Sequence, residues 1–138
     1  MRRSTSRAVV IAALLSLAAC GGPQEGTPGF VIEMQSQRLL SEASLLAIYF
    51  YDEAQSCESV RAAMPRPTSV LGPFRADLDD AGRDSGIIFR QDAVPVGTYL
   101  VFVDALDVNG ALVGTGCSPG QRVNEREVSA IRVSVQDS

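Results

Sequence analysis

The chain has 138 residues, with sixteen acidic residues against twelve Arg, and its formal net charge is −4 at pH 7. It contains no Lys, His or Trp. The Arg residues are scattered and form no basic stripe for a phosphate backbone, so we expect no nucleic-acid partner. Without His or Lys the chain cannot build a Ser-His-Asp triad, a Cys-His pair or a Schiff base. We therefore predict that it is not an enzyme.

The first nineteen residues have the parts of a secretory signal peptide. A basic stretch that ends at Arg7 is followed by the apolar run Ala8–Leu17. This run is well short of the roughly twenty residues that a membrane-spanning helix needs. We therefore expect residues 1–19 to be a cleaved signal peptide and not a permanent membrane span.

Leu17-Ala18-Ala19-Cys20 directly follows the apolar run and resembles the lipobox of bacterial lipoproteins. The resemblance implies cleavage after Ala19, diacylglycerol on the Cys20 thiol and a further acyl chain, such as palmitate, on the new amine. Two or three acyl chains anchor a protein durably. Gly21 follows Cys20 in place of Asp, which resembles the pattern for passage to the outer membrane of Gram-negative bacteria. The alternative is an ordinary cysteine beside an ordinary cleavage site.

The segment Gly21–Gly29 is rich in Gly and Pro and has no large apolar residue. Such a composition is typical of a flexible linker. We therefore expect residues 20–29 to comprise the lipidated cysteine and its tether. Residues 30–138 are expected to form one exported domain, because about 110 residues suit a single hydrophobic core.

If Cys20 carries lipid, the two remaining thiols are Cys57 and Cys117. Disulfides form and persist outside the cytoplasm, so a Cys57–Cys117 disulfide is the expected pairing. The alternative is a pair of free thiols that bind a metal ion. The absence of His and of a Cys-x-x-Cys spacing argues against that alternative.

From residue 30 onward the apolar residues mostly alternate with period two, which predicts β-strands. Phe30–Gln35 and Ser129–Val135 alternate regularly, so each is predicted to have one buried and one solvated face. Leu45–Tyr51 and Tyr99–Leu106 are more uniformly apolar and aromatic, which predicts central strands covered on both faces. Gly86–Arg90 is a shorter predicted strand.

The connections between these strands also have recognisable chemistry. Asp107–Gly110 contains the Asn-Gly pair of tight turns, which predicts a hairpin. A short helix is expected within Glu53–Met64, because its apolar residues recur at helical spacing before two prolines. Leu39–Ser44 is a candidate for a further helical turn. Pro65–Arg83 is expected to be a long loop, and we consider it the first candidate for contact with a partner.

About seven short strands with Gly- and Pro-containing turns predict an all-β fold, a small antiparallel β-sandwich of two sheets with one short helix. Val94–Val103 resembles the start of a strand in transthyretin-like sandwiches, which include the regulatory domains of carboxypeptidases and the B-type repeats of collagen adhesins. The resemblance implies a transthyretin-like or Greek-key topology, in which Pro95 and Gly97 set a turn before Tyr99. Such adhesin repeats often crosslink a Lys to an Asn, a bond that a chain without Lys cannot form.

Two groups of residues suggest ligands. Four aspartates are weak candidates for a calcium site, namely Asp77, Asp79, Asp80 and Asp84. The first, third and sixth positions of this segment match a calcium-binding loop, but Ala81 and Ile88 stand at its fifth and twelfth positions, so the alternative is a solvated loop. The Gly114-Thr-Gly116 segment lacks the length and the Lys of a phosphate-binding loop, and we expect its glycines to relieve crowding in a strand.

Tyr49 and Tyr51 share one side of their predicted strand, where they could form a platform on which a sugar stacks. The alternative is that both rings belong to the core, as aromatic residues on central strands usually do. The leading hypothesis is a non-catalytic, lipid-anchored protein of the cell envelope that acts as a structural or protein-interaction module. Calcium or carbohydrate binding is the alternative function.

Overall fold

The computed structural model of the chain describes residues 25–78, 87–125 and 128–138. In chain order the elements are β1 (Glu25–Met34), α1 (Gln37–Glu42), β2 (Leu45–Asp52), α2 (Cys57–Ala62), β3 (Leu71–Asp77), β4 (Ile87–Arg90), β5 (Val94–Pro95), β6 (Gly97–Leu106), β7 (Leu112–Val123) and β8 (Val128–Asp137). The predicted all-β class is confirmed, because strands dominate and each described helix has six residues. Neither of these helices has the length and apolar character needed to span a lipid bilayer.

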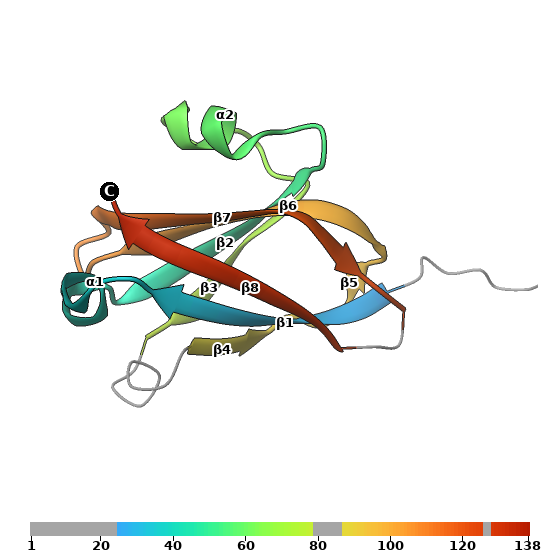
Figure 1. Cartoon of the computed structure of the whole chain (residues 1–138), viewed down its shortest axis with the longest axis horizontal. Coiled ribbons are helices and arrows are strands. Elements are labelled where there is room, and N and C mark those ends of the chain that lie inside the picture. The colour runs from blue at the N-terminus through green and yellow to red at the C-terminus, as the bar shows by residue number, and fades with distance from the viewer. Residues whose placement is uncertain (1–24, 79–86, 126–127) are drawn as a thin grey trace, which may run out of the picture.

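The strands form one mixed sheet in the order β3-β2-β6-β7-β8-β1-β4, and the short β5 pairs with β1. The sheet curls, so that β1 and β4 form a layer below β2, β6 and β7 (Figure 1). The prediction of an antiparallel sheet is wrong for one pair, because β1 and β8 run parallel from Thr27 opposite Val128 to Met34 opposite Val135. Alternation within a strand says which residues share a face and nothing about the direction of its neighbour. The curled arrangement places one continuous core inside the sheet.

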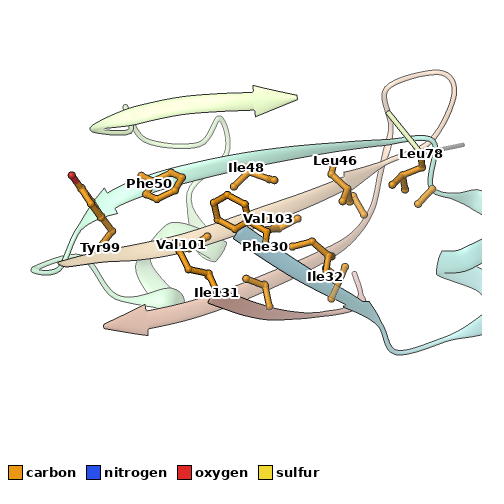
Figure 2. Close-up of a cluster of buried hydrophobic side chains, with 14 of the residues drawn as sticks. Phe30, Ile32, Leu46, Ile48, Phe50, Leu78, Tyr99, Val101, Val103 and Ile131 are labelled. Atoms are coloured by element: carbon orange, nitrogen blue, oxygen red, sulfur yellow. The ribbon is translucent and has the colours of Figure 1, made fainter. Parts of the chain in front are cut away.

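Alternate residues of the long strands fill this core (Figure 2). The ring of Phe50 of β2 makes edge-to-face contacts with Phe30, Phe74 and Tyr99 at centroid distances of 5.6, 5.8 and 5.3 Å. The two faces of β8 differ as predicted, because Ala130, Arg132 and Ser134 are exposed and the apolar residues that follow each of them are buried. The buried residues of β8 include Ile131, Val133 and Val135.

The tether predicted for residues 20–29 is too long, because β1 begins at Glu25. Gly26 pairs with Val94 of β5, and Thr27 pairs with Val128 of β8. A Cβ atom on Gly26 would lie 2.2 Å from the carbonyl oxygen of Asn124, so only glycine allows this close approach of two backbones. The sequence suggested a linker because glycine is typical of flexible segments. In the structure Gly26 instead permits the tight packing of β1.

The segment that resembles transthyretin-like sandwiches leads into β6. This strand begins at Gly97, two residues before the predicted start at Tyr99. The hydroxyl of Tyr99 donates a hydrogen bond to the carbonyl oxygen of Pro95 at 2.8 Å. Since Pro95 pairs with Glu25, this bond ties the start of β6 to the start of β1.

The predicted hairpin between β6 and β7 is confirmed. The amide of Gly110 donates to the carbonyl oxygen of Asp107 at 3.0 Å, and Gly110 has a φ of 81°. The carboxylate of Asp107 also accepts bonds from the amides of Asn109 and Ala111, each at 2.8 Å. A side-chain oxygen that satisfies two loop amides is the chemistry expected of Asp in a turn.

The two short helices fall where the sequence suggested, α2 inside the range 53–64 and α1 overlapping 39–44. Each helix begins after a serine whose side-chain oxygen accepts a hydrogen bond from the backbone amide three residues later. Ser36 accepts from Leu39, and Ser56 accepts from Ser59. The prediction of an unbroken loop over 65–83 is wrong, because β3 lies within it and pairs with β2. Gly72 and Pro73 interrupt the alternation of this edge strand and hide it from a pattern search.

Gly114 and Gly116 relieve crowding in β7, as predicted. A Cβ atom on Gly114 would lie 2.5 Å from Leu39 Cδ2. One on Gly116 would lie 2.6 Å from the carbonyl oxygen of Ser134 and 2.7 Å from Val133 Cγ1. Both glycines therefore let β7 pack closely against its neighbours.

We predict that Gly116→Ala lowers the free energy of unfolding by roughly 1–3 kcal/mol, because the added methyl group meets backbone atoms that cannot move aside freely. Urea unfolding of the exported domain would measure the change. Gly120→Asn is the control, since nothing lies within 4 Å of a Cβ there and Asn tolerates the positive φ of 66°. An unchanged stability in Gly116→Ala would contradict the close packing of β7 against β8.

Candidate functional site

The outer face of the sheet carries a second, smaller apolar cluster. Its fully buried members are Tyr51 of β2, Leu100 and Phe102 of β6, and Val60 of α2. Residues 53–70, which we call the cap, run from β2 to β3 and place α2 over the outer side of the sheet (Figure 1). The prediction that β2 and β6 are covered on both faces is therefore confirmed.

A disulfide joins the cap to β7. Cys57, the first residue of α2, is bonded to Cys117, and their Cα atoms are 5.8 Å apart. Cys117 lies opposite Phe102 in the register of β6 and β7, so the bond lies beside the outer cluster. The structure thus contains the pairing that the sequence led us to expect.

A buried ion pair joins the cap to β6. The side chains of Arg66 and Asp104 are only 8% and 7% exposed. Arg66 Nε lies 3.0 Å from Asp104 Oδ2, and Nη2 lies 2.9 Å from Oδ1. The guanidinium carbon also lies 4.8 Å from the ring centroid of Phe102, a cation–π distance. Asp104 is thereby satisfied on the outer face of a central strand.

The same arginine completes the end of α2. Its Nη1 donates to the carbonyl oxygens of Val60, Arg61 and Ala63 at 3.0, 2.8 and 3.2 Å. Carbonyl groups in the last turn of a helix lack partners within the helix. Arg66 therefore links α2 to the sheet through one rigid, planar group.

Tyr49 and Tyr51 stack with their ring centroids 6.0 Å apart, but they do not form an exposed platform. Tyr51 is 1% exposed, and its hydroxyl donates to the carbonyl oxygen of Pro67 at 3.1 Å. Burial raises the pKa of both phenols above the ordinary value of 10.0, because it disfavours the charged phenolate. Sugar stacking needs an open ring face, and Tyr51 does not offer one.

A cavity of about 450 Å³ lies between the cap and residues of β7 and of the end of β8. Its lining comes from Arg61, Met64 and Arg66 of the cap, Leu112 and Thr115 of β7, and Gln136, Asp137 and Ser138 at the end of β8. The walls combine hydrogen-bond donors, aliphatic surface and charges of both signs. Such a mixture suits the binding of a small polar molecule.

The other predicted site residues are mostly outside the described residues. Cys20 is among these, as are Asp79, Asp80 and Asp84, whereas Asp77 ends β3 with its side chain exposed. Within residues 25–78, 87–125 and 128–138, no three His, Cys, Asp or Glu residues are grouped so that they could hold a metal ion.

Sequence reasoning missed Arg66, Asp104 and Thr115. A signal for the ion pair was present, because Asp104 is a lone charge in a strand predicted to be covered on both faces. A buried carboxylate needs a partner, and an arginine between two prolines in the nearby cap could have been proposed. No sequence signal distinguishes Thr115 from an ordinary strand residue.

Comparisons of the chain with protein-family models, curated proteins and solved structures gave no match. The role of the outer face is therefore inferred from its own residues and their contacts.

We predict that replacing both cysteines, in Cys57→Ala/Cys117→Ala, lowers the free energy of unfolding by about 2–4 kcal/mol, because the disulfide closes a loop with a sequence separation of 60 residues. The inner core does not include either cysteine, so the variant should still fold. The loss would be measured by urea unfolding of residues 21–138, after the protein has been produced by export to an oxidising compartment. The matched control is the parent domain unfolded with a reductant, which should show a similar loss. Equal stability of the parent and the variant would contradict this role of the disulfide.

Proposed function

We propose that the protein is a non-catalytic, lipid-anchored protein of the cell envelope, whose exported domain is a structural or protein-interaction module. Residues 1–19 direct export, and lipid on Cys20 holds the mature chain at the outer membrane. The proposal includes a transthyretin-like relationship of the domain, for which Val94–Val103 is the support. The lipobox at Leu17–Cys20 is the observation that carries the anchored part of the proposal.

The position of β1 supports a short distance between anchor and domain. Because this strand begins at Glu25, residues 21–24 separate it from Cys20. Four residues can span at most about 14 Å when fully extended. The end of the sheet that contains the start of β1 is therefore the end nearest the membrane.

Charge keeps the domain from lying flat on that membrane. Without residues 1–19, nine Arg remain against sixteen acidic residues. An anionic lipid surface repels such a domain, and the acyl chains rather than the protein surface provide the attachment. We therefore expect one end of the domain to lie near the headgroups while the rest projects away.

The parallel pairing of β1 and β8 determines which end of the domain projects away from the membrane. β8 starts beside Thr27 and ends beyond Met34, so its last residues lie at the opposite end of the sheet from Glu25 (Figure 1). The cavity beside Gln136 and Asp137 belongs to this distal end. A domain that carries its cavity away from the membrane is suited to present that surface to soluble molecules or to other proteins.

The two alternative functions have less support. Of the four aspartates proposed for calcium, only Asp77 is among the described residues, and it is exposed at the end of a strand. Carbohydrate stacking on Tyr49 and Tyr51 conflicts with the burial of Tyr51. We therefore propose an interaction module rather than a calcium- or sugar-binding one.

We predict that Cys20→Ser abolishes the incorporation of labelled palmitate into the protein in bacteria, because the thiol that starts lipoprotein processing is lost. Metabolic labelling followed by immunoprecipitation would measure this incorporation. Cys117→Ser is the matched control and should retain the label, since Cys117 is not part of the lipobox. Label that persists in Cys20→Ser would refute the anchor.

A further inference from the structure

Two valines are exposed at the end of the sheet where β1 begins. Val128, the first residue of β8, is 54% exposed and lies opposite Thr27 of β1. Val96 is 39% exposed and directly follows Pro95, which pairs with Glu25. The starts of β1 and β8 lie at the same end of the molecule, opposite the C-terminus (Figure 1). The first residues of β1 therefore lie beside two apolar side chains that the domain leaves uncovered.

The length of chain between this end and Cys20 brings both valines close to the lipid. Residues 21–24 separate Cys20 from Glu25, and they span at most about 14 Å. Val96 follows the residue opposite Glu25, and Val128 lies opposite the second residue after Glu25, which is about 7 Å farther along the strand. With lipid on Cys20, both side chains are held within reach of the bilayer surface.

The charges at this end of the sheet do not attract a membrane. Arg90 and Arg122 are exposed there, and so are the acidic residues Glu25, Asp92 and Glu125. A surface whose charges are mixed and slightly negative gains nothing from anionic headgroups. A favourable contact between this end and lipid must therefore be apolar, and neutral headgroups suit it best.

The acyl chains make a small apolar contact effective. Two partly exposed valines bury too little surface to hold a free protein at a membrane. A domain that is already anchored meets the bilayer at a high effective concentration, so a weak contact suffices to select one orientation. The acyl chains then provide the attachment, and the valines determine which part of the domain faces the lipid.

We infer that Val96 and Val128 insert into the headgroup region of the bilayer and hold the domain upright on its anchor. The partner of this end of the domain is a lipid surface with mainly neutral headgroups. The inference rests on the proposed function, because it requires lipid on Cys20. It adds a direct contact between the folded domain and the bilayer, and this contact keeps the opposite end of the sheet away from the membrane.

The first test uses the mature chain, residues 20–138, with one synthetic hexadecyl chain coupled to the thiol of Cys20. This thiol is the only free one, because Cys57 and Cys117 form the disulfide. One acyl chain gives only marginal and reversible binding, so a small contribution from the protein becomes measurable. Sedimentation with phosphatidylcholine vesicles gives the partition coefficient.

We expect Val96→Ser/Val128→Ser to lower this partition coefficient by about tenfold, the loss for two half-buried valines. Val108→Ser is the matched control, since Val108 is 83% exposed in the hairpin at the opposite end of the sheet. It should leave the coefficient unchanged. Equal partitioning of the parent and the double variant, or an equal loss in Val108→Ser, would overturn the inference.

The composition of the vesicles gives a second comparison. Replacing a third of the phosphatidylcholine by phosphatidylglycerol should weaken the partitioning of the parent chain, because the acidic domain is repelled. Stronger partitioning would show that arginines rather than valines make the contact, which would contradict the inference.

A measurement on the unaltered protein separates this inference from the anchor itself. The protein is purified from the bacterial envelope, its lipid on Cys20 is identified by mass spectrometry, and it is placed in phosphatidylcholine nanodiscs with spin-labelled lipids. We expect the NMR signals of the Val96 and Val128 methyl groups to broaden and those of Val108 to stay sharp. Lipidated protein in which all three valines broaden equally, or none does, would overturn the contact and leave the anchor standing. Protein without lipid on Cys20 would refute the proposed function and this inference with it.

Discussion

The buried ion pair between Arg66 and Asp104 is the interaction on which the outer half of the structure depends. Removing two charges from water is costly, and the pair is tolerated because nearly all of its polar atoms have partners. Asp104 receives hydrogen bonds from Nε and Nη2, while Nη1 binds three carbonyl oxygens at the end of α2. The carboxylate on β6 and the carbonyl groups of α2 therefore rely on the same guanidinium. The cap cannot leave the sheet without exposing the outer cluster and separating this charge pair.

The closed cap explains why β2 and β6 are apolar on both faces. Their inward residues pack against β1 and β8 inside the curled sheet, and their outward residues pack beneath the cap. Three bonds of different kinds hold the cap, namely the disulfide from Cys57, the ion pair of Arg66 and the hydrogen bond from Tyr51 to Pro67. The cavity lies beside the ion pair, between the cap and residues of β7 and β8. Of the residues in these three bonds, Arg66 also lines the cavity.

Much of the fold could be predicted because side-chain alternation records burial directly. It located the core face of β8, the two-sided burial of β2 and β6, and the hairpin at Asp107–Gly110. The prediction failed where strands contain glycine and proline. Gly26 and Pro28 suggested a linker although they belong to β1, and Gly72 and Pro73 interrupt the alternation of β3. The parallel pairing of β1 and β8 was also missed, because the relative direction of two strands depends on the path of the chain between them and not on the pattern within either strand. Among the site residues, the cysteine pair was expected, whereas the pairing of Arg66 with Asp104 depends on which residues the fold brings together.

The most direct test of the central claim is a double-mutant cycle on Arg66→Met and Asp104→Leu, with the free energy of unfolding measured in urea. Each single replacement leaves one buried charge unpaired, so each should cost about 3–5 kcal/mol. The double replacement should cost much less than the sum, because Met and Leu can pack beside Phe102 without a charge between them. Single losses that simply add in the double variant would show that Arg66 and Asp104 act independently, which would contradict the dependence of the cap on their pairing.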